Sequence, residues 1–295
     1  MIYKKIILMG QGTIALEILK HLFEFKSFIE VISYKPNYFC MLKTFCEKKE
    51  IFYKDFKDSL QITNFLSTIN VPTLIISANN NYIFPSVILS KNNFKIINFH
   101  NALLPQYKGV NAPIWSIYNQ DSTTGITWHI VTEDIDSGNI IIQENIQLDD
   151  DITSFKLIKN LMQLGIKTFL QIKQNLLNDK LNTYPMPYSD IKPKKSNQLP
   201  NDGFLDIEWG KEKISAFLRS MDTKGILPKP KIKISQTEYI ITEYKLNNPI
   251  IKTDSMLLNK NNIYMLLEEK GLGGGALKKY SNNPIYLPYY QEKIC

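Results

Sequence analysis

The chain has 295 residues, of which 44% are hydrophobic and 21% charged, and this composition fits a globular enzyme with a substantial core. Its 35 Lys and Arg against 28 Asp and Glu give a net charge of +7, which suits an anionic partner such as RNA, a nucleotide or a phosphorylated metabolite. The lysines are spread along the chain, so charge alone does not choose among these partners. The group Lys192, Lys194 and Lys195 is typical of a solvated linker.

Targeting, membrane and metal signals are weak. The N-terminal apolar run is broken by Gly10 and Gly12 with no small-residue cleavage site after it, and no stretch approaches the roughly 18 to 20 apolar residues of a membrane span. Cys40, Cys46 and Cys295 form no CxxC pair, so neither a disulfide framework nor a zinc site is indicated. We therefore expect a cytoplasmic protein without a membrane partner or a metal.

Strand and helix signals alternate over the first 180 residues. An apolar run at 4–9 is followed by a helical pattern from Ile14 to Leu22. Further strands are expected at 29–33, 51–53, 73–76 and 95–99, with helices near 38–48, 60–69 and 87. This alternation predicts a mostly parallel sheet covered on both faces, with the ligand outside the carboxyl ends of its strands.

The pattern changes after residue 120. Strands are expected at 125–131 and 139–147, joined by the acidic turn 133–138, and Thr153 is expected to cap a long amphipathic helix that ends near Leu177. The stretch 181–203 carries four prolines and no periodicity. A helix at 211–221 and short strands at 231–235, 239–244 and 262–267 follow.

These elements predict an α/β fold with two domains. We expect a catalytic domain with a Rossmann-like, mostly parallel sheet over 1–185, a linker over 186–203, and a smaller, mainly β C-terminal domain over 204–295.

Two glycine clusters invite a phosphate-binding interpretation. Gly10–Ala15 fits the GxGxxA fingerprint, but the next strand ends in Ser33 and Tyr34 where a dinucleotide site needs an acidic residue. An NAD-dependent dehydrogenase thus remains an alternative to a plain tight turn, and the turn can still line a substrate phosphate site through Gln11. Gly271–Gly275 lacks the GK[ST] ending and fits a flexible surface loop better.

The most informative stretch begins at the end of the strand near residue 99. Asn98 and His100 lie two residues apart, so strand alternation points them to the same side. From the residues alone, a structural or capping role is as good an explanation as catalysis. His129 lies inside a strand, which favours a hydrogen-bonded or half-exposed imidazole, with a site-lining role left open. His21 lies in the first helix and needs no functional role, and an acidic turn such as Glu133–Asp136 is usually solvated.

A family resemblance changes this balance. The block NFHNALLPQYKGVNAPIWSI, followed closely by GITWHIVTEDIDSGNII, resembles the formyltetrahydrofolate-dependent formyltransferases. The shared pattern is N-x-H, then LLP-x-aromatic-Lys/Arg-G, then D-x-G at the end of an acidic turn. It covers roughly residues 75 to 150, with a weaker Rossmann-like match before it.

The resemblance implies roles for particular residues. It makes Asn98, His100 and Asp136 a catalytic trio, and it implies that formyltetrahydrofolate is the co-substrate. The residues that it implies for folate are Tyr82, Ile83 and Pro85 in a pterin-side loop, Ala102, Leu103, Leu104 and Pro105 after the strand, and Thr132, Glu133 and Asp134 in the acidic turn.

These residue types suit formyl transfer to an amine. Asn98 can donate an N–H to the developing oxyanion, and one such fixed donor is worth roughly 3 to 4 kcal/mol. His100 can take a proton from the amine or, when protonated, stabilise the oxyanion. Asp136 would orient the imidazole and raise its pKa.

The acceptor amine is less sharply indicated. The methionyl-tRNA formyltransferases carry a long basic insertion after their second strand. The corresponding region of this chain, which begins at residues 33–40, is short and lacks arginine, so a nucleic-acid partner is disfavoured. The segment 104–111 resembles the sugar-site loop of the sugar-nucleotide N-formyltransferases, which implies substrate contacts from Tyr107, Lys108, Gly109 and Asn111.

We therefore expect a nucleotide-linked amino sugar, of the 4-amino-4,6-dideoxy or 3-amino type, for surface polysaccharide such as lipopolysaccharide O-antigen. The alternatives are a methionyl-tRNA formyltransferase and a non-catalytic folate-binding relative. A homodimer is compatible with the sequence.

Overall fold

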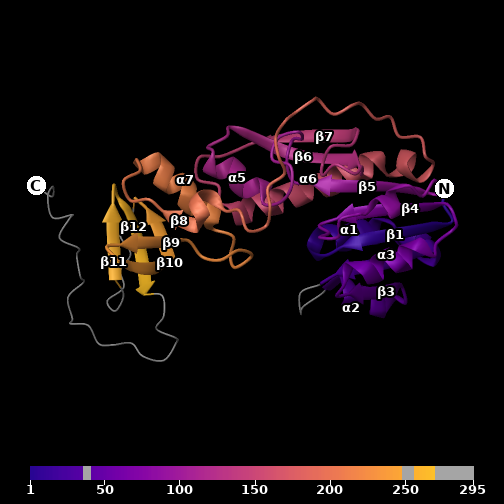
Figure 1. The fold of residues 1–295 in the computed structure, drawn as a ribbon, viewed down its shortest axis with the longest axis horizontal. Coiled ribbons are helices and arrows are strands. Elements are labelled where there is room, and N and C mark those ends of the chain that lie inside the picture. The colour runs from indigo at the N-terminus through magenta and orange to yellow at the C-terminus, as the bar shows by residue number, and fades with distance from the viewer. Residues whose placement is uncertain (36–40, 248–255, 270–295) are drawn as a thin grey trace, which may run out of the picture. The chain divides into compact units, whose positions relative to one another are not determined.

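A computed structural model describes residues 1–35, 41–247 and 256–269 (Figure 1). The chain divides into two compact units. Unit 1 comprises Met1–Ala112, Thr123–Gln147 and Ile158–Lys195, and unit 2 comprises Pro113–Ser122, Leu148–Leu157 and Ser196–Cys295. Cys40, Cys295 and the glycine cluster Gly271–Gly275 lie outside the described residues.

Unit 1 is built on a seven-stranded sheet of order β3-β2-β1-β4-β5-β6-β7. The first five strands in that order pair in parallel, whereas β6 pairs antiparallel with both β5 and β7. The predicted Rossmann-like, mostly parallel sheet is thus confirmed. The strands are β1 (Lys5–Gly10), β2 (Ile29–Tyr34), β3 (Phe52–Phe56), β4 (Thr73–Ala78), β5 (Phe94–His100), β6 (Thr123–Ile130) and β7 (Ile140–Gln147).

The central strands are nearly continuous apolar runs because both of their faces are covered. Ile7 and Met9 of β1 pack in one cluster with Ile62 of α3 and Ile88 of α4, so the alternate residues Ile6 and Leu8 face the other side. The helices that lie wholly or mostly in unit 1 are α1 (Gly12–His21), α2 (Met41–Lys49), α3 (Ser59–Ser67), α4 (Ser86–Leu89) and α6 (Ser154–Leu177), with the 3₁₀ helix η1 (Phe23–Phe28).

Local signals account for several helix starts and close contacts. Asp58 caps α3, because its carboxylate accepts the Leu60 N–H at 2.7 Å. Thr153 Oγ1 accepts the Lys156 N–H at 3.5 Å, in keeping with its predicted role before α6. Phe99 of β5 packs directly on Gly165 of α6, where an added Cβ would lie 2.2 Å from the ring.

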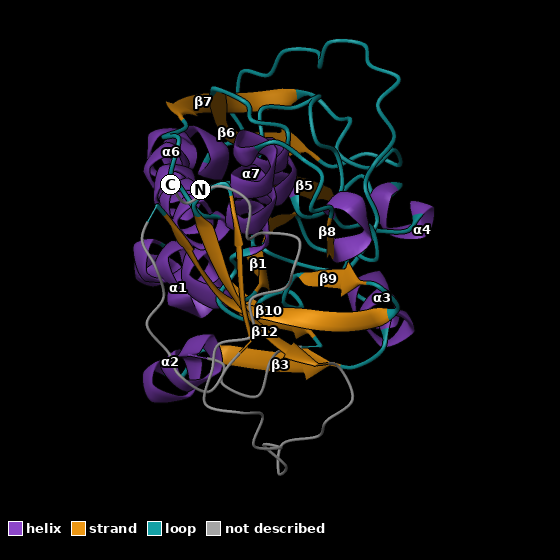
Figure 2. Ribbon diagram, turned by 90° about the vertical axis from the view of Figure 1, so that its left-hand side faces the viewer, coloured by secondary structure: helices purple, strands orange, loops and turns teal. Residues whose placement is uncertain are grey.

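Unit 2 contains a second, smaller sheet of order β11-β12-β10-β9-β8, in which all pairings are antiparallel except that of β8 with β9 (Figure 2). The predicted mainly β second part is therefore confirmed. Its elements are α5 (Ala112–Tyr118), η2 (Pro200–Gly203), β8 (Phe204–Leu205), α7 (Lys211–Met221), β9 (Lys231–Ile234), β10 (Thr237–Leu246), β11 (Met256–Lys260) and β12 (Ile263–Glu269).

The core of unit 2 gathers Ile114 of α5, Phe217 of α7 and Ile241 of β10. The sequence did not predict α5, β8 or β11, and the first two are too short to show a periodic pattern. Among the described residues, no helix has both the length and the apolar composition needed to cross a bilayer.

Candidate active site

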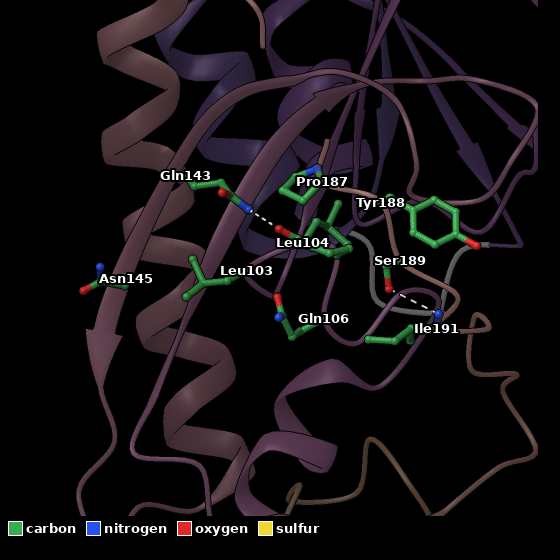
Figure 3. A pocket seen from close by; sticks show the side chains of 10 residues that line it. Leu103, Leu104, Gln106, Gln143, Asn145, Pro187, Tyr188, Ser189 and Ile191 are labelled. Carbon is green, nitrogen blue, oxygen red and sulfur yellow. Dashed lines mark hydrogen bonds between the residues drawn. The ribbon is translucent and has the colours of Figure 1, made fainter. Parts of the chain in front are cut away.

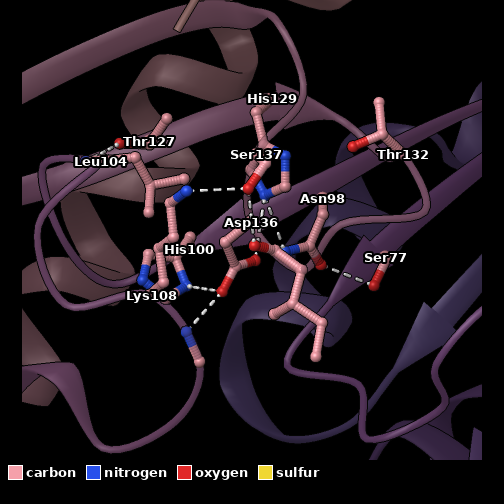
Figure 4. A network of polar contacts seen from close by, with 12 residues as sticks. Ser77, Asn98, His100, Leu104, Lys108, Thr127, His129, Thr132, Asp136 and Ser137 are labelled. Atoms are coloured by element: carbon pink, nitrogen blue, oxygen red, sulfur yellow. Dashed lines mark hydrogen bonds and ion pairs between the residues drawn. The ribbon is translucent and has the colours of Figure 1, made fainter. Parts of the chain in front are cut away.

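The candidate site begins at the carboxyl end of β5, on one face of unit 1's sheet. The β5–β6 register pairs Asn98 with His129 and His100 with Thr127. Because alternate residues of a strand share a face, the amide, both imidazoles and the threonine hydroxyl lie on the same side of the two strands. Figure 4 shows Asn98, His100 and His129 converging on Asp136.

Asp136 reaches this face from the turn that follows β6. Gly138 allows the turn to fold back, since an added Cβ would lie 2.0 Å from the Ile130 carbonyl oxygen. Asp136 itself has φ of 51°, a left-handed conformation that aspartate tolerates better than most residues. The turn therefore directs the carboxylate back over β5 and β6.

The carboxylate of Asp136 lies between the two imidazoles. Its Oδ2 is 3.4 Å from His100 Nδ1, and its Oδ1 is 3.3 Å from His129 Nε2. The Gly109 N–H also donates to Oδ2, at 2.7 Å. Burial alone would raise the pKa of Asp136, but His100, His129 and the Gly109 N–H outweigh burial and hold that pKa well below its usual range. The carboxylate is thus charged at neutral pH.

His100 is held through its other ring nitrogen. Nε2 lies 2.9 Å from the Tyr107 carbonyl oxygen, which can only accept, so Nε2 carries a proton and donates it. Burial lowers the pKa of His100, and the charge of Asp136 opposes that lowering only in part. In the neutral ring Nδ1 is the free acceptor, so a proton taken up by His100 arrives at Nδ1 and faces Asp136.

Asn98 is contacted on both sides. Its Oδ1 accepts from Ser77 Oγ of β4 at 2.7 Å, and its Nδ2 lies 3.2 Å from His129 Nε2. One of the two Nδ2 hydrogens points at His129, which leaves the other available to a ligand. The site therefore offers a fixed amide donor, a proton acceptor and a charged carboxylate.

The loop after β5 is tied to the sheet and to residue 194. Gly109 has φ of 88° and pairs with Lys194, and an added Cβ would lie 2.3 Å from the Lys194 carbonyl oxygen. Lys108 is buried, with 8% of its surface exposed, and its Nζ donates to Ser137 Oγ at 2.8 Å. Three predicted substrate residues, Tyr107, Lys108 and Gly109, therefore contact His100, Ser137 and Asp136 respectively.

The remaining predicted substrate residues lie at element boundaries. Gln11 precedes α1, and its carbonyl oxygen accepts from Asn79 Nδ2 at 3.1 Å. Asn111 precedes α5 with φ of 64°.

The glycine turn is closed by Ser33 at the end of β2. The Ser33 hydroxyl donates to the Gly10 carbonyl oxygen at 2.8 Å in a buried contact.

The predicted folate residues do not line a single pocket. Leu103, Leu104 and Pro105 line an open pocket of about 590 Å³ with Gln143 and residues 187–191 (Figure 3). Thr132 and Glu133 line another, of about 540 Å³, together with Val87 and its neighbours in α4.

The other predicted folate residues differ in exposure. Pro85 precedes α4, and Ile83 is 69% exposed. Tyr82 is buried in the core, and its hydroxyl lies 2.8 Å from Thr63 Oγ1. Ala102 is buried and its carbonyl accepts from Thr127, while Asp134 is exposed at the tip of the acidic turn.

Sequence reasoning left a site-lining role for His129 open, and it gave no role to Ser77 or Thr127. His129 and Ser77 contact Asn98 directly, and Thr127 joins the loop to the sheet. Thr127 Oγ1 donates to the Ala102 carbonyl at 2.7 Å and accepts from the Leu104 N–H and from Gln143 Nε2. Pairing of β6 with β5 is the signal that would have found His129 and Thr127. In the described part of the chain, no three His, Cys, Asp or Glu side chains cluster as metal ligands do.

An amide and an imidazole at the end of β5, with a carboxylate from the turn after β6, are the groups expected of a group-transfer enzyme of the formyltransferase class. The profile of the formyl transferase family matches residues 7–172, which is more than half of the chain. The chain belongs to this family.

Curated relatives divide between sugar and tRNA enzymes. The chain is 30% identical over 152 residues to GDP-perosamine N-formyltransferase of Brucella melitensis, covering 51% of this chain and 57% of that protein. It is 34% identical over 193 residues to methionyl-tRNA formyltransferase of Clostridioides difficile, covering 65% and 58%. It is also 26% identical to the bifunctional polymyxin resistance protein ArnA of Wigglesworthia glossinidia brevipalpis, covering 78% of this chain but 35% of that protein. The chain thus spans only part of each of these relatives.

Solved structures share the fold over most of the chain. The sugar 3N-formyltransferase WlaRD, solved with dTDP and 5-N-formyl-THF, matches with a TM-score of 0.67 and 20% identity over 90% of this chain and 98% of that one. The N-formyltransferase of Helicobacter canadensis, in complex with folinic acid and dTDP-3-aminofucose, matches with a TM-score of 0.68 and 17% identity over 90% and 99%.

Proposed function

We propose that the chain transfers a formyl group from formyltetrahydrofolate to the amino group of a nucleotide-linked amino sugar. The observation that carries the proposal is the contact between Asp136 and His100. Asp136 Oδ2 lies 3.4 Å from His100 Nδ1, and the amide of Asn98 lies beside them. Family membership over residues 7–172 supports formyl transfer. The folates named in both structural relatives, and the sugar nucleotide named in the Helicobacter canadensis structure, support the two substrates.

The three side chains have complementary roles in this reaction. Attack of a neutral amine on a formyl carbon places negative charge on the formyl oxygen, and the Asn98 Nδ2–H donates to that oxygen. His100 accepts the proton of the attacking amine at Nδ1, the nitrogen that Tyr107 leaves free. Asp136 stabilises the resulting imidazolium, and His100 then gives the proton to the leaving nitrogen.

The pocket beside α4 is the better candidate for the pterin ring. Its lining combines the apolar side chains Val87 and Val131 with the polar groups of Thr132 and Glu133, and Val87 is 57% exposed. An exposed apolar wall with polar groups at its rim suits a flat, partly polar heterocycle. The sequence predicts that Leu103, Leu104 and Pro105 bind folate, so we assign the rest of the folate to the pocket that these residues line.

A sugar nucleotide is favoured over tRNA as the carrier of the acceptor amine. GDP-perosamine and dTDP-3-aminofucose, named for two of the relatives, are sugar nucleotides, and WlaRD is a sugar formyltransferase solved with the nucleotide dTDP. The buried ammonium of Lys108 suits an anionic or hydroxyl-rich substrate at the loop 104–111. Such a product would serve surface polysaccharide, including the O-antigen of lipopolysaccharide, and the reaction would take place in the cytoplasm.

The test is formyl transfer from 10-formyltetrahydrofolate, followed by mass spectrometry of the acceptor. The acceptor panel contains GDP-, dTDP- and UDP-linked 3-amino and 4-amino sugars, with methionyl-tRNA as a separate arm. We expect one sugar nucleotide to gain a formyl group and tRNA to remain unchanged. Formylation of methionyl-tRNA alone would overturn the acceptor, and a folded chain inactive on every acceptor would overturn the proposed function.

Substitutions within the trio tie the activity to this site. His100→Ala and Asp136→Ala are expected to lower kcat by roughly a hundredfold or more. His21→Ala is the matched control, because His21 ends α1 and its backbone carbonyl, which alanine keeps, accepts from Lys173 Nζ at 3.2 Å. Full activity of either trio variant would show that the proposed mechanism is wrong.

A further inference from the structure

The amide of Asn98 is fixed by two neighbours that the proposed chemistry does not use. Ser77 Oγ lies 2.7 Å from Oδ1 on one side, and His129 Nε2 lies 3.2 Å from Nδ2 on the other. An asparagine amide has nearly the same shape when its oxygen and nitrogen are exchanged. What decides its orientation is therefore the hydrogen-bonding character of these two neighbours.

The first neighbour, Ser77, is a donor to the amide. It is buried at the end of β4 with 2% exposure. Asn80 Nδ2 lies 3.4 Å from Ser77 Oγ and 3.2 Å from the Tyr82 carbonyl, so the serine oxygen already faces a donor. The single hydroxyl hydrogen is left for Asn98 Oδ1.

The second neighbour, His129, has one nitrogen whose state is determined. Nδ1 lies 2.9 Å from the Ile130 carbonyl oxygen and must carry a proton to bond with it. Nε2 lies between Asn98 Nδ2 at 3.2 Å and Asp136 Oδ1 at 3.3 Å. One of these groups is a donor and the other an acceptor, so Nε2 can satisfy only one of them.

The contact between Ser77 and Asn98 decides which of these two groups Nε2 bonds with. The imidazole of His129 is 2% exposed, and its surroundings hold other charged or titratable groups, namely Asp136, His100 across that carboxylate, and Lys108, whose Nζ contacts Ser137. Because Ser77 donates to Asn98 Oδ1, the amide nitrogen Nδ2 faces His129, and an N–H on Nε2 would place two donors 3.2 Å apart. A bare Nε2 instead accepts the Asn98 Nδ2–H.

We propose that His129, protonated on Nδ1 and unprotonated on Nε2, acts with Ser77 to hold the Asn98 amide with its nitrogen toward the reacting centre. Ser77 and His129 are thus positioning residues for the oxyanion donor. The inference deepens the proposed function, on which the donor role of Asn98 rests. A reversed amide would present its oxygen on the side of His129 and Asp136, and an oxygen there would repel a developing oxyanion.

The tautomer can be measured without any activity. The chain has only three histidines, so long-range ¹H–¹⁵N spectra of the imidazoles can be assigned with His21→Ala and His100→Gln variants. We expect His129 to show a protonated Nδ1 and an unprotonated Nε2 at neutral pH. An Nε2-protonated tautomer or an imidazolium would overturn the inference, whatever the chain's substrate.

Kinetics test the positioning role separately. Ser77→Ala is expected to lower kcat by roughly ten- to a hundredfold with little change in KM, because the donor is misplaced while the substrates still bind. Ser77→Thr keeps the hydroxyl and is expected to recover most of the loss. Thr73→Val is the matched control, since it removes another buried hydroxyl from β4, one bonded to the Val71 carbonyl at the strand's opposite end.

Two results would contradict the positioning role. One is a folded Ser77→Ala variant with wild-type kcat, and the other is a rise in KM alone. A wild-type chain that lacks formyl transfer altogether would instead contradict the proposed function and leave the tautomer measurement to decide this inference.

Discussion

The backbone N–H of Gly109 donates to Oδ2 of Asp136 at 2.7 Å, and this bond joins the loop after β5 to the turn after β6. The donor's position depends on the close approach of Gly109 to the Lys194 backbone. The charged member of the trio is therefore held partly by a segment more than 50 residues farther along the chain.

A side chain at position 109 should break this arrangement. Gly109→Ala adds a Cβ 2.3 Å from the Lys194 carbonyl oxygen at a φ of 88°, so we expect a loss of more than about 2 kcal/mol in unfolding free energy and a large loss of activity. Urea unfolding and the transfer assay would measure both.

Gly225→Ala is the control for the backbone conformation alone. Gly225 has φ of 92°, but an added Cβ there would meet nothing within 4 Å. That variant should lose about 1 to 2 kcal/mol from the left-handed conformation and keep its activity. Equal effects at the two positions would contradict the role given to the Gly109–Lys194 contact.

The hydroxyl of Thr127 should contribute strongly to the free energy of unfolding. Its hydroxyl serves the Ala102 carbonyl, the Leu104 N–H and Gln143 Nε2, and the residue is fully buried. Thr127→Val preserves the shape but leaves these groups short of a partner, so we expect a cost of about 1 to 3 kcal/mol. Thr73→Val, which removes a hydroxyl with one acceptor, should cost less by the same denaturant titration.

The depressed pKa of Asp136 predicts a pH dependence of stability. Because the folded-state pKa lies below the unfolded value of about 3.9, the ionised carboxylate stabilises the folded chain above that pH. This contribution is lost as the pH falls below about 4 toward the folded-state pKa. The unfolding free energy of the wild type should therefore fall more steeply between pH 5 and 3 than that of Asp136→Asn, by roughly 1 kcal/mol or more.

Asp134→Asn provides the comparison for that titration, since it removes an exposed carboxylate from the same turn. Parallel acid profiles for the wild type and Asp136→Asn would contradict the stabilising role of the Asp136 charge.

The lowered pKa of His100 predicts the acid limb of the rate profile. The proposed reaction needs a neutral imidazole, and burial keeps His100 neutral to a lower pH than an ordinary histidine. The value of kcat/KM should thus be flat near neutrality and fall only below about pH 6.5. Asp136→Asn removes the charge that opposes the lowering, so its acid limb should move lower still. A wild-type limb centred above pH 6.5 would show that this assignment is wrong.

Much of the fold was predictable because strands and helices of unit 1 have clear local signals. The run at 4–9, the run at 73–76 and the pattern over 95–99 each became a strand of the sheet. The same-face placement of Asn98 and His100 followed from strand alternation alone. Asp136 could be chosen from the acidic turn only through the family resemblance, since its neighbours are equally acidic.

The residues that were missed or left open share one physical reason, which is that the sequence does not reveal which strands are neighbours. His129 contacts Asn98 because β6 pairs with β5, and local periodicity is the same for any pairing. Ser77 likewise meets Asn98 through the parallel register of β4 with β5. The contact between Gly109 and Lys194 joins two irregular segments that carry no periodic signal at all.

The alternation of β5 also limits how this strand can change. Asn98 and His100 face the polar network, while Phe99 between them packs on Trp128 at 5.3 Å between ring centroids and against Gly165. A single-residue insertion or deletion in β5 would exchange these faces, driving an imidazole into the apolar layer and a phenyl ring into the reaction centre. The strand should therefore accept substitutions of matched size far more readily than any change in its length.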